Sequence, residues 1–252
     1  MQSTGETIKI FIDFDGTVAK NDVGDMLFER FGGERSLRAV REYLQGTISA
    51  VTCFKEECAS CGDVDRSALE EFLTGQEIDD SFAAFVGFCS TQNFTTCILS
   101  DGMDYYIRRI LADRGLADVP FFSNTLTLQP AGNDGRVNFI PSFPYTDETC
   151  DRCASCKRNH MLSLCGDSDV IVYIGEGYSD RCPARYADIV FAKDDLLKYC
   201  RQESLPCYEY TSFADVQDRL QSMVSEQSRG TRGVFKKRKK AVQAWQDLLR
   251  GG

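Results

Sequence analysis

Two aspartates near the start of the chain, Asp13 and Asp15, have a type and a spacing that suit chemistry at a single point. They follow the run 8–12, whose β-branched and aromatic residues are typical of a buried parallel strand. Side chains two residues apart on an extended chain point to the same side. The two carboxylates are therefore expected to meet at the carboxyl end of this strand, where open α/β sheets bind their ligands.

Two buried carboxylates at one point need a cation beside them. A polar turn at Asp15-Gly16 is the alternative, and it accounts for Asp15 but not for Asp13, which lies in strand register. We therefore favour a site with a metal ion and a carboxylate nucleophile.

A second polar segment, Ser100-Asp101-Gly102, lies between the predicted strand 94–99 and the predicted helix 104–116. Free backbone N–H groups at a helix N-terminus bind anions, and a serine adds a hydroxyl beside them. Ser100 as a plain helix cap is the alternative.

Predicted strands and helices alternate along most of the chain, which indicates an α/β fold with a doubly wound, Rossmann-like parallel sheet. Between 21 and 90 helical spacing replaces the strand pattern and predicts an inserted helical cap. Asn133-Asp134-Gly135 predicts a β-hairpin between two strands. The expected parts are the α/β core 1–20 and 91–226, the helical cap 21–90 and a basic tail 227–252.

Three acids, Asp22, Asp25 and Glu29, open the predicted cap. They could face a pocket beside the aspartate pair. We favour the alternative of a solvated helix start, because acids are stabilised at a helix N-terminus.

The charge balance restricts the partners. The chain of 252 residues has a net charge of −9, and residues 229–252 hold eight Lys/Arg and one Asp, which leaves −16 for the rest. Such an acidic body repels phosphate backbones, so nucleic acid is not expected as the main substrate. No apolar run is long enough to span a membrane, and no signal peptide is visible, so we expect a cytoplasmic protein. The oligomeric state stays open.

Twelve cysteines without a signal peptide indicate reduced thiols rather than disulfides. Cys150, Cys153 and Cys156 have a spacing that suits a structural Zn²⁺, with Cys182 as a fourth candidate ligand. Clustered free thiols are the alternative that we favour.

Four segments together resemble the four motifs of the haloacid dehalogenase superfamily of phosphatases. They are the Asp13 segment, the Ser100 segment, Lys157 at the start of a predicted helix, and Gly175-Glu176-Gly177-Tyr178-Ser179-Asp180 after the predicted strand 170–174. The match covers the chain to about residue 226. It is greatest to the phosphoserine-phosphatase-like branch, and within it to the 2-hydroxy-3-keto-5-methylthiopentenyl-1-phosphate phosphatase group.

The resemblance implies a Mg²⁺-dependent phosphatase that acts on a small phosphorylated metabolite through an aspartyl-phosphate. Asp13 would attack phosphorus, and Asp15 would protonate the leaving oxygen and then deprotonate water. The implied phosphate-binding residues are Thr17, Ser100, Asp101, Gly102 and Lys157, the last also acting in catalysis. The implied metal ligands are Asp13, Asp15, Glu176 and Asp180.

One position departs from the resemblance, because Glu176 stands where the family has aspartate. The longer side chain moves the carboxylate outward, and Mg²⁺ demands near-octahedral geometry. A rotamer change or a bridging water could absorb the difference, or metal binding could weaken. A weakly active or inactive phosphate-binding protein is therefore the alternative function. The candidate substrates that the resemblance implies are 2-hydroxy-3-keto-5-methylthiopentenyl-1-phosphate, phosphoserine, and phosphoethanolamine or phosphocholine.

Overall fold

The computed structural model describes residues 7–150 and 152–228. The chain divides into two compact units, each built from separate stretches of sequence. In the described residues, unit 1 comprises 7–13, 79–97 and 158–228, and unit 2 comprises 14–78, 98–150 and 152–157. The basic tail predicted at the C-terminus lies outside the described residues from 229 onward.

Unit 1 is built on parallel strands. β1 (Ile8–Ile12) pairs with β6 (Val170–Gly175), which pairs with β7 (Ile189–Ala192), and β7 pairs with β8 (Tyr208–Glu209). Every residue of β6 and β7 is buried. Such uninterrupted burial is typical of parallel strands covered on both faces.

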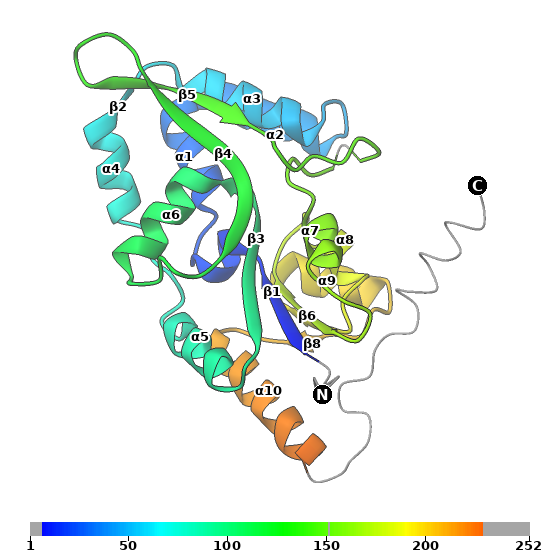
Figure 1. Cartoon of the computed structure of the whole chain (residues 1–252). Coiled ribbons are helices and arrows are strands. Elements are labelled where there is room, and N and C mark those ends of the chain that lie inside the picture. The colour runs from blue at the N-terminus through cyan, green and yellow to red at the C-terminus, as the bar shows by residue number, and fades with distance from the viewer. Residues whose placement is uncertain (1–6, 151, 229–252) are drawn as a thin grey trace. The chain divides into compact units, whose positions relative to one another are not determined.

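The helices of unit 1 lie in the chain between its strands or after the last of them (Figure 1). They are α5 (Phe82–Thr91), α7 (Lys157–Ser163), α8 (Arg181–Ala184), α9 (Asp194–Gln202) and α10 (Phe213–Ser228), with Lys157 itself at the edge of unit 2. Phe213 packs its ring against Phe82 and Phe85, with centroids 4.8 and 5.1 Å apart. These rings hold α10 against α5.

Unit 2 contains the predicted hairpin. β3 (Thr95–Met103), which enters the unit at Ile98, runs parallel to β4 (Phe121–Pro130), and β4 turns back into the antiparallel β5 (Arg136–Ser142). The short β2 (Val64–Asp65) adds to β5 in antiparallel register. The turn at residues 133–135 is confirmed. β2 was not predicted, because two residues carry no periodic pattern.

Helices make up the first part of unit 2. They are α1 (Val23–Gly32), α2 (Glu34–Leu44), α3 (Ala50–Cys61) and α4 (Arg66–Thr74), with α6 (Asp104–Asp113) after β3. Asp22, Ser49 and Asp65 accept backbone N–H groups at the starts of α1, α3 and α4, which satisfies donors that a helix leaves free. The helical character predicted after residue 21 is confirmed.

The fold is α/β, mostly parallel, with an antiparallel hairpin, as the sequence predicted. The proposed division into core and cap stays a prediction, because the two compact units follow different boundaries. Among the described residues, no helix is long and apolar enough to cross a membrane.

Candidate active site

In unit 1, acids follow the carboxyl ends of two paired strands. Ile12 lies opposite Ile174 in the parallel register, and the backbone N–H of Asp13 donates to the carbonyl of Ile174 at 2.9 Å. Asp13 is 5% exposed. Glu176 follows two residues after Ile174, so both carboxylates belong to the same edge of the sheet.

Asp180 holds the loop that carries Glu176. Its Oδ2 accepts the N–H groups of Glu176 and Gly177, each at 2.9 Å, and its Oδ1 accepts the Tyr173 hydroxyl at 2.6 Å. A Cβ on Gly175 would come within 2.5 Å of Asp180 Oδ2, so a glycine is needed there. The geometry gives Asp180 a role in shaping the loop, and its predicted metal ligation stays a prediction.

In unit 2, Asp15 is surrounded by hydrogen-bond donors. Its Oδ1 accepts the N–H groups of Val23 at 3.0 Å and Gly24 at 3.4 Å in the first turn of α1. Its Oδ2 accepts the Tyr106 hydroxyl at 2.7 Å and the Ser100 hydroxyl at 3.4 Å. The carboxyl group is therefore held in one orientation.

Burial raises the pKa of Asp15 to about 8, with a further increase from the charge of Asp22. The hydrogen bonds from Tyr106 and the two backbone amides lower this pKa in part. A carboxyl with a pKa near neutral can give up a proton and take one back. This is the behaviour that an acid/base group requires.

The backbone after Asp15 turns sharply through Gly16, whose φ of +67° favours glycine. Ala19 donates its N–H to the carbonyl of Phe14 at 2.9 Å and closes this turn. Thr17 lies within it and is 1% exposed. The turn therefore fixes the backbone of Thr17, the residue predicted to bind phosphate, within unit 2.

Ser100 is not the cap of α6. The strand β3 continues to Met103, which is the residue that precedes α6, and Ser100 Oγ instead accepts the N–H of Gly102 at 2.9 Å. The capping alternative is therefore wrong. Ser100 is 1% exposed, and its hydroxyl lies beside the carboxyl of Asp15.

Asp101 anchors the loop that leads to Lys157. Its Oδ1 accepts the N–H groups of Ala154 and Ser155, each at 2.7 Å, while its backbone carbonyl accepts the Asn124 side chain at 2.6 Å. Burial raises the pKa of Asp101, and donors that include Ser155 and the nearby charge of Lys157 lower it in part. Asp101 therefore helps to place Lys157, which is 1% exposed. Its own contact with phosphate stays a prediction.

Further carboxyl groups of unit 2 extend from Asp15 into α1 and α3. Burial and then the charge of Asp22 raise the pKa of Asp25 to about 6. Burial and then the charge of Asp25 raise the pKa of Glu57 to about 8, although Ser36 donates a hydrogen bond to Glu57 at 3.2 Å. Asp22 accepts the N–H of Asp25 at 2.8 Å as the N-cap of α1, and both side chains are exposed, so the solvated helix start favoured by sequence is confirmed for these two acids. The charge of Asp22 also contributes to the raised pKa of Asp25, so the two carboxyl groups lie close enough to repel each other.

Sequence reasoning missed Tyr106 and Glu57. Tyr106 occupies an apolar position of α6, and Glu57 is one of two adjacent acids on α3. Neither spacing nor residue type distinguished them from core and surface residues. Their roles depend on partners that lie far away in the sequence.

The described part of the thiol segment shows no group of side chains arranged as a metal site. Within the described ranges, no three His, Cys, Asp or Glu side chains form a group that could hold a metal ion. The thiol of Cys156 lies 4.0 Å from Asp147 Oδ2, and a hydrogen bond with Cys156 and then burial raise the pKa of Cys153. The structural Zn²⁺ considered for Cys150, Cys153 and Cys156 is therefore not supported.

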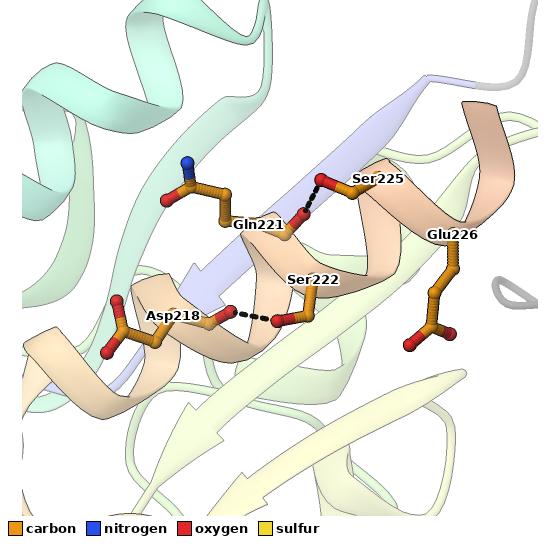
Figure 2. A pocket seen from close by; sticks show the side chains of 5 residues that line it. All are labelled: Asp218, Gln221, Ser222, Ser225 and Glu226. Atoms are coloured by element: carbon orange, nitrogen blue, oxygen red, sulfur yellow. Dashed lines mark hydrogen bonds between the residues drawn. The ribbon is translucent and has the colours of Figure 1, made fainter. Parts of the chain in front are cut away.

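A hollow of about 570 Å³ lies along α10 in unit 1. It is lined by Asp218, Gln221, Ser222, Ser225 and Glu226 (Figure 2). The two serine hydroxyls donate to the carbonyls of Asp218 and Gln221 in their own helix. No motif residue lines this hollow, so it is not the candidate active site.

Comparison with known proteins gives a consistent result. The family described as Putative Phosphatase matches residues 8–203. Pdp3-interacting factor 1 of Schizosaccharomyces pombe is 30% identical over 227 residues, which cover 85% of this chain and 95% of that protein. The 2-hydroxy-3-keto-5-methylthiopentenyl-1-phosphate phosphatase of Exiguobacterium sibiricum is 27% identical over 220 residues, which cover 86% of this chain and 97% of that protein.

Solved structures show the same fold. A phosphoserine phosphatase captured as a phospho-aspartyl intermediate analogue matches with a TM-score of 0.64 and 16% identity, over 85% of this chain and 99% of that one. A substrate-bound phosphoserine phosphatase matches with a TM-score of 0.63 and 16% identity, over 86% of this chain and 99% of that one. At this identity the likeness concerns the fold alone.

Proposed function

Because the chain belongs to the Putative Phosphatase family, within the haloacid dehalogenase superfamily, we propose that it is a Mg²⁺-dependent phosphomonoesterase that acts through an aspartyl-phosphate. The observation that carries this proposal is the environment of Asp15. Its carboxyl is buried, held by donors on both oxygens, and has a pKa of about 8. It lies two residues after Asp13, a carboxylate at the end of a buried strand.

The proposed reaction has two steps. In the first, a carboxylate oxygen of Asp13 attacks phosphorus, the bond to the leaving oxygen breaks, and Asp15 gives that oxygen its proton. In the second, water attacks phosphorus, the bond to Asp13 breaks, and Asp15 takes the proton from water. Asp15 thus returns to its starting state.

The phosphate group would be held by residues of unit 2. Ser100 and Thr17 offer hydroxyls, Gly102 a backbone N–H, and Lys157 an ammonium group. The buried charge of Lys157 offsets the repulsion between an anionic nucleophile and an anionic phosphate. The loop anchored by Asp101 holds this lysine in place.

The donor set fits Mg²⁺. This ion prefers oxygen ligands and is usually held by one or two carboxylates together with water and substrate phosphate. Asp13 and Glu176 supply carboxylates at one sheet edge, and the backbone carbonyl of Asp15 is the third proposed ligand. When bound, Mg²⁺ would neutralise charge that develops on the phosphoryl oxygens.

The acids of unit 2 favour a substrate with a cationic group. Asp22, Asp25 and Glu57 form a series that begins beside Asp15. Burial raises the pKa of each, and the charge of a neighbouring acid raises the pKa of Asp25 and of Glu57 further. A substrate ammonium would relieve that repulsion. Among the candidate substrates, this supports phosphoethanolamine or phosphocholine. The relative from Exiguobacterium supports its named substrate instead.

The proposal is tested by a hydrolysis screen with and without Mg²⁺. The panel contains p-nitrophenyl phosphate, phosphoethanolamine, phosphocholine, phosphoserine and 2-hydroxy-3-keto-5-methylthiopentenyl-1-phosphate. We expect Mg²⁺-dependent release of phosphate that Asp13→Asn abolishes. Unchanged hydrolysis of p-nitrophenyl phosphate by Asp13→Asn in the presence of Mg²⁺ would refute the mechanism.

A phosphate-binding or regulatory protein on the same fold is the second candidate. Two observations favour it: Glu176 replaces the aspartate of the family motif, and the relative from Schizosaccharomyces pombe is named for an interaction. Glu176→Asp separates the two functions. Activity that appears only in this variant would support the second candidate, and comparable activity in both proteins would exclude it.

A further inference from the structure

We propose that the phenol of Tyr106 is a positioning residue for Asp15, and that it determines which oxygen of this carboxyl exchanges a proton with the substrate. The inference rests on the proposed function, because it assigns a role to a residue that acts through the acid/base group. All the residues involved belong to unit 2.

The two oxygens of Asp15 have different surroundings. Oδ1 faces two backbone amides in the first turn of α1, at 3.0 and 3.4 Å. These groups can only donate, so a proton on Oδ1 would face other protons. Oδ2 faces hydroxyl groups, of which Tyr106 is the nearer at 2.7 Å. Hydroxyls can donate or accept, so the transferred proton belongs on Oδ2.

Neighbouring residues leave space for the phenol hydroxyl of Tyr106 beside the carboxyl of Asp15. Tyr106 is 1% exposed, and its ring packs near Phe14. A Cβ on Gly102 would lie 1.7 Å from the phenol oxygen and 2.6 Å from Oδ2 of Asp15. A Cβ on Gly24 would lie 3.2 Å from the same oxygen. Two glycines on separate elements thus leave room for the hydroxyl beside the carboxyl.

The phenol is the nearer of the two hydroxyl groups at Oδ2, and it donates to this oxygen at 2.7 Å. Without the phenol, Oδ2 keeps only the more distant Ser100 hydroxyl at 3.4 Å. The carboxyl is then held mainly through the backbone amides at Oδ1, so Oδ2 is less well fixed and proton transfer to the leaving oxygen becomes slower.

The inference predicts an effect that depends on the leaving group. p-Nitrophenolate departs without a proton, whereas the alkoxide of phosphoethanolamine needs one. The value of kcat/KM covers the steps up to departure of the leaving group, so it isolates this difference. For Tyr106→Phe we expect kcat/KM to fall about 10-fold or more for phosphoethanolamine, and less than about 3-fold for p-nitrophenyl phosphate.

Tyr105→Phe is the matched control. It removes a phenol from the adjacent position of the same helix, and that phenol donates to Glu70 rather than to Asp15. We expect the ratio of kcat/KM for the two substrates to stay as in the wild type. Equal losses on both substrates in Tyr106→Phe would overturn the inference, because they indicate a purely structural role.

Gly24→Ala provides a second variant if Tyr106→Phe does not fold. It keeps the phenol but adds a methyl group 3.2 Å from the phenol oxygen, and alanine is favoured over glycine inside a helix. We expect kcat/KM for phosphoethanolamine to fall more than kcat/KM for p-nitrophenyl phosphate, by a smaller factor than in Tyr106→Phe. An unchanged ratio of the two kcat/KM values would overturn the inference. If the wild type hydrolyses no phosphoester at all, the proposed function fails. If it hydrolyses both and only the ratio stays constant, the role of Tyr106 alone fails.

Discussion

Replacing Asp180 tests whether this aspartate anchors its own loop. The carboxylate is fully buried and accepts three donors, the Tyr173 hydroxyl and the N–H groups of Glu176 and Gly177. Asp180→Ala leaves all three donors without their partner, and a buried unsatisfied group costs about 1–3 kcal/mol. Since water can enter the space left behind, we expect a total loss of about 3–5 kcal/mol in the free energy of unfolding.

Asp180→Asn keeps most of these contacts. The amide oxygen can accept both backbone N–H groups, while its NH₂ meets the Tyr173 hydroxyl, which rotates to accept. We therefore expect the free energy of unfolding to fall by only about 1 kcal/mol, because the hydrogen bonds remain but lose the strength that the negative charge gave them.

The assay is equilibrium unfolding in urea followed by far-ultraviolet circular dichroism. Asp195→Ala is the control, because Asp195 is an exposed carboxylate of unit 1 that forms an ion pair with Lys198 at the surface. We expect little change in its unfolding midpoint. An Asp180→Ala variant within about 1 kcal/mol of the wild type would refute the anchoring role.

Two further outcomes follow from unit 2. Burial and then the charge of Asp25 raise the pKa of Glu57 from 4.5 to about 8. Between these two values the folded state keeps a proton on Glu57 that the unfolded chain releases. The free energy of unfolding should therefore fall as pH rises from about 5 to 8, by at most about 1.4 kcal/mol per pH unit. Urea midpoints at pH 5, 6.5 and 8 should fall less steeply for Glu57→Gln, and parallel curves for the two proteins would contradict this. Asp101→Ala frees the loop held at Ala154 and Ser155. We expect the inhibition constant of inorganic phosphate to rise about 10-fold, which corresponds to the net free energy of one or two hydrogen bonds. An unchanged inhibition constant would contradict the role of Asp101 in placing Lys157.

The architecture was predictable from sequence because periodic patterns report local structure. The apolar run before Asp13, the helical spacing after Asp22 and the turn at Asn133-Asp134-Gly135 each predicted an element that is observed. Strand ends also predicted where polar side chains collect, since the carboxyl ends of parallel strands share one edge of a sheet.

The partners of individual side chains were not predictable in the same way. Tyr106 has the spacing of a core residue, and its acceptor Asp15 lies 91 residues earlier. Asp101 and Asp180 were assigned to phosphate and metal by motif order, but their carboxylates also bind backbone amides of nearby loops. Such contacts depend on how loops fold, and no residue spacing reports that.

The interrupted sequence of each unit has a consequence for how the protein is made. Ile8 of β1 pairs in register with Val170 of β6, so the first strand leaves the ribosome long before its neighbour exists. Unit 2 ends at residue 157 and is complete while much of unit 1 is still to be synthesised. During translation the apolar first strand therefore stays without its β6 partner until β6 has been made, and unpaired strand edges of this kind are prone to aggregation.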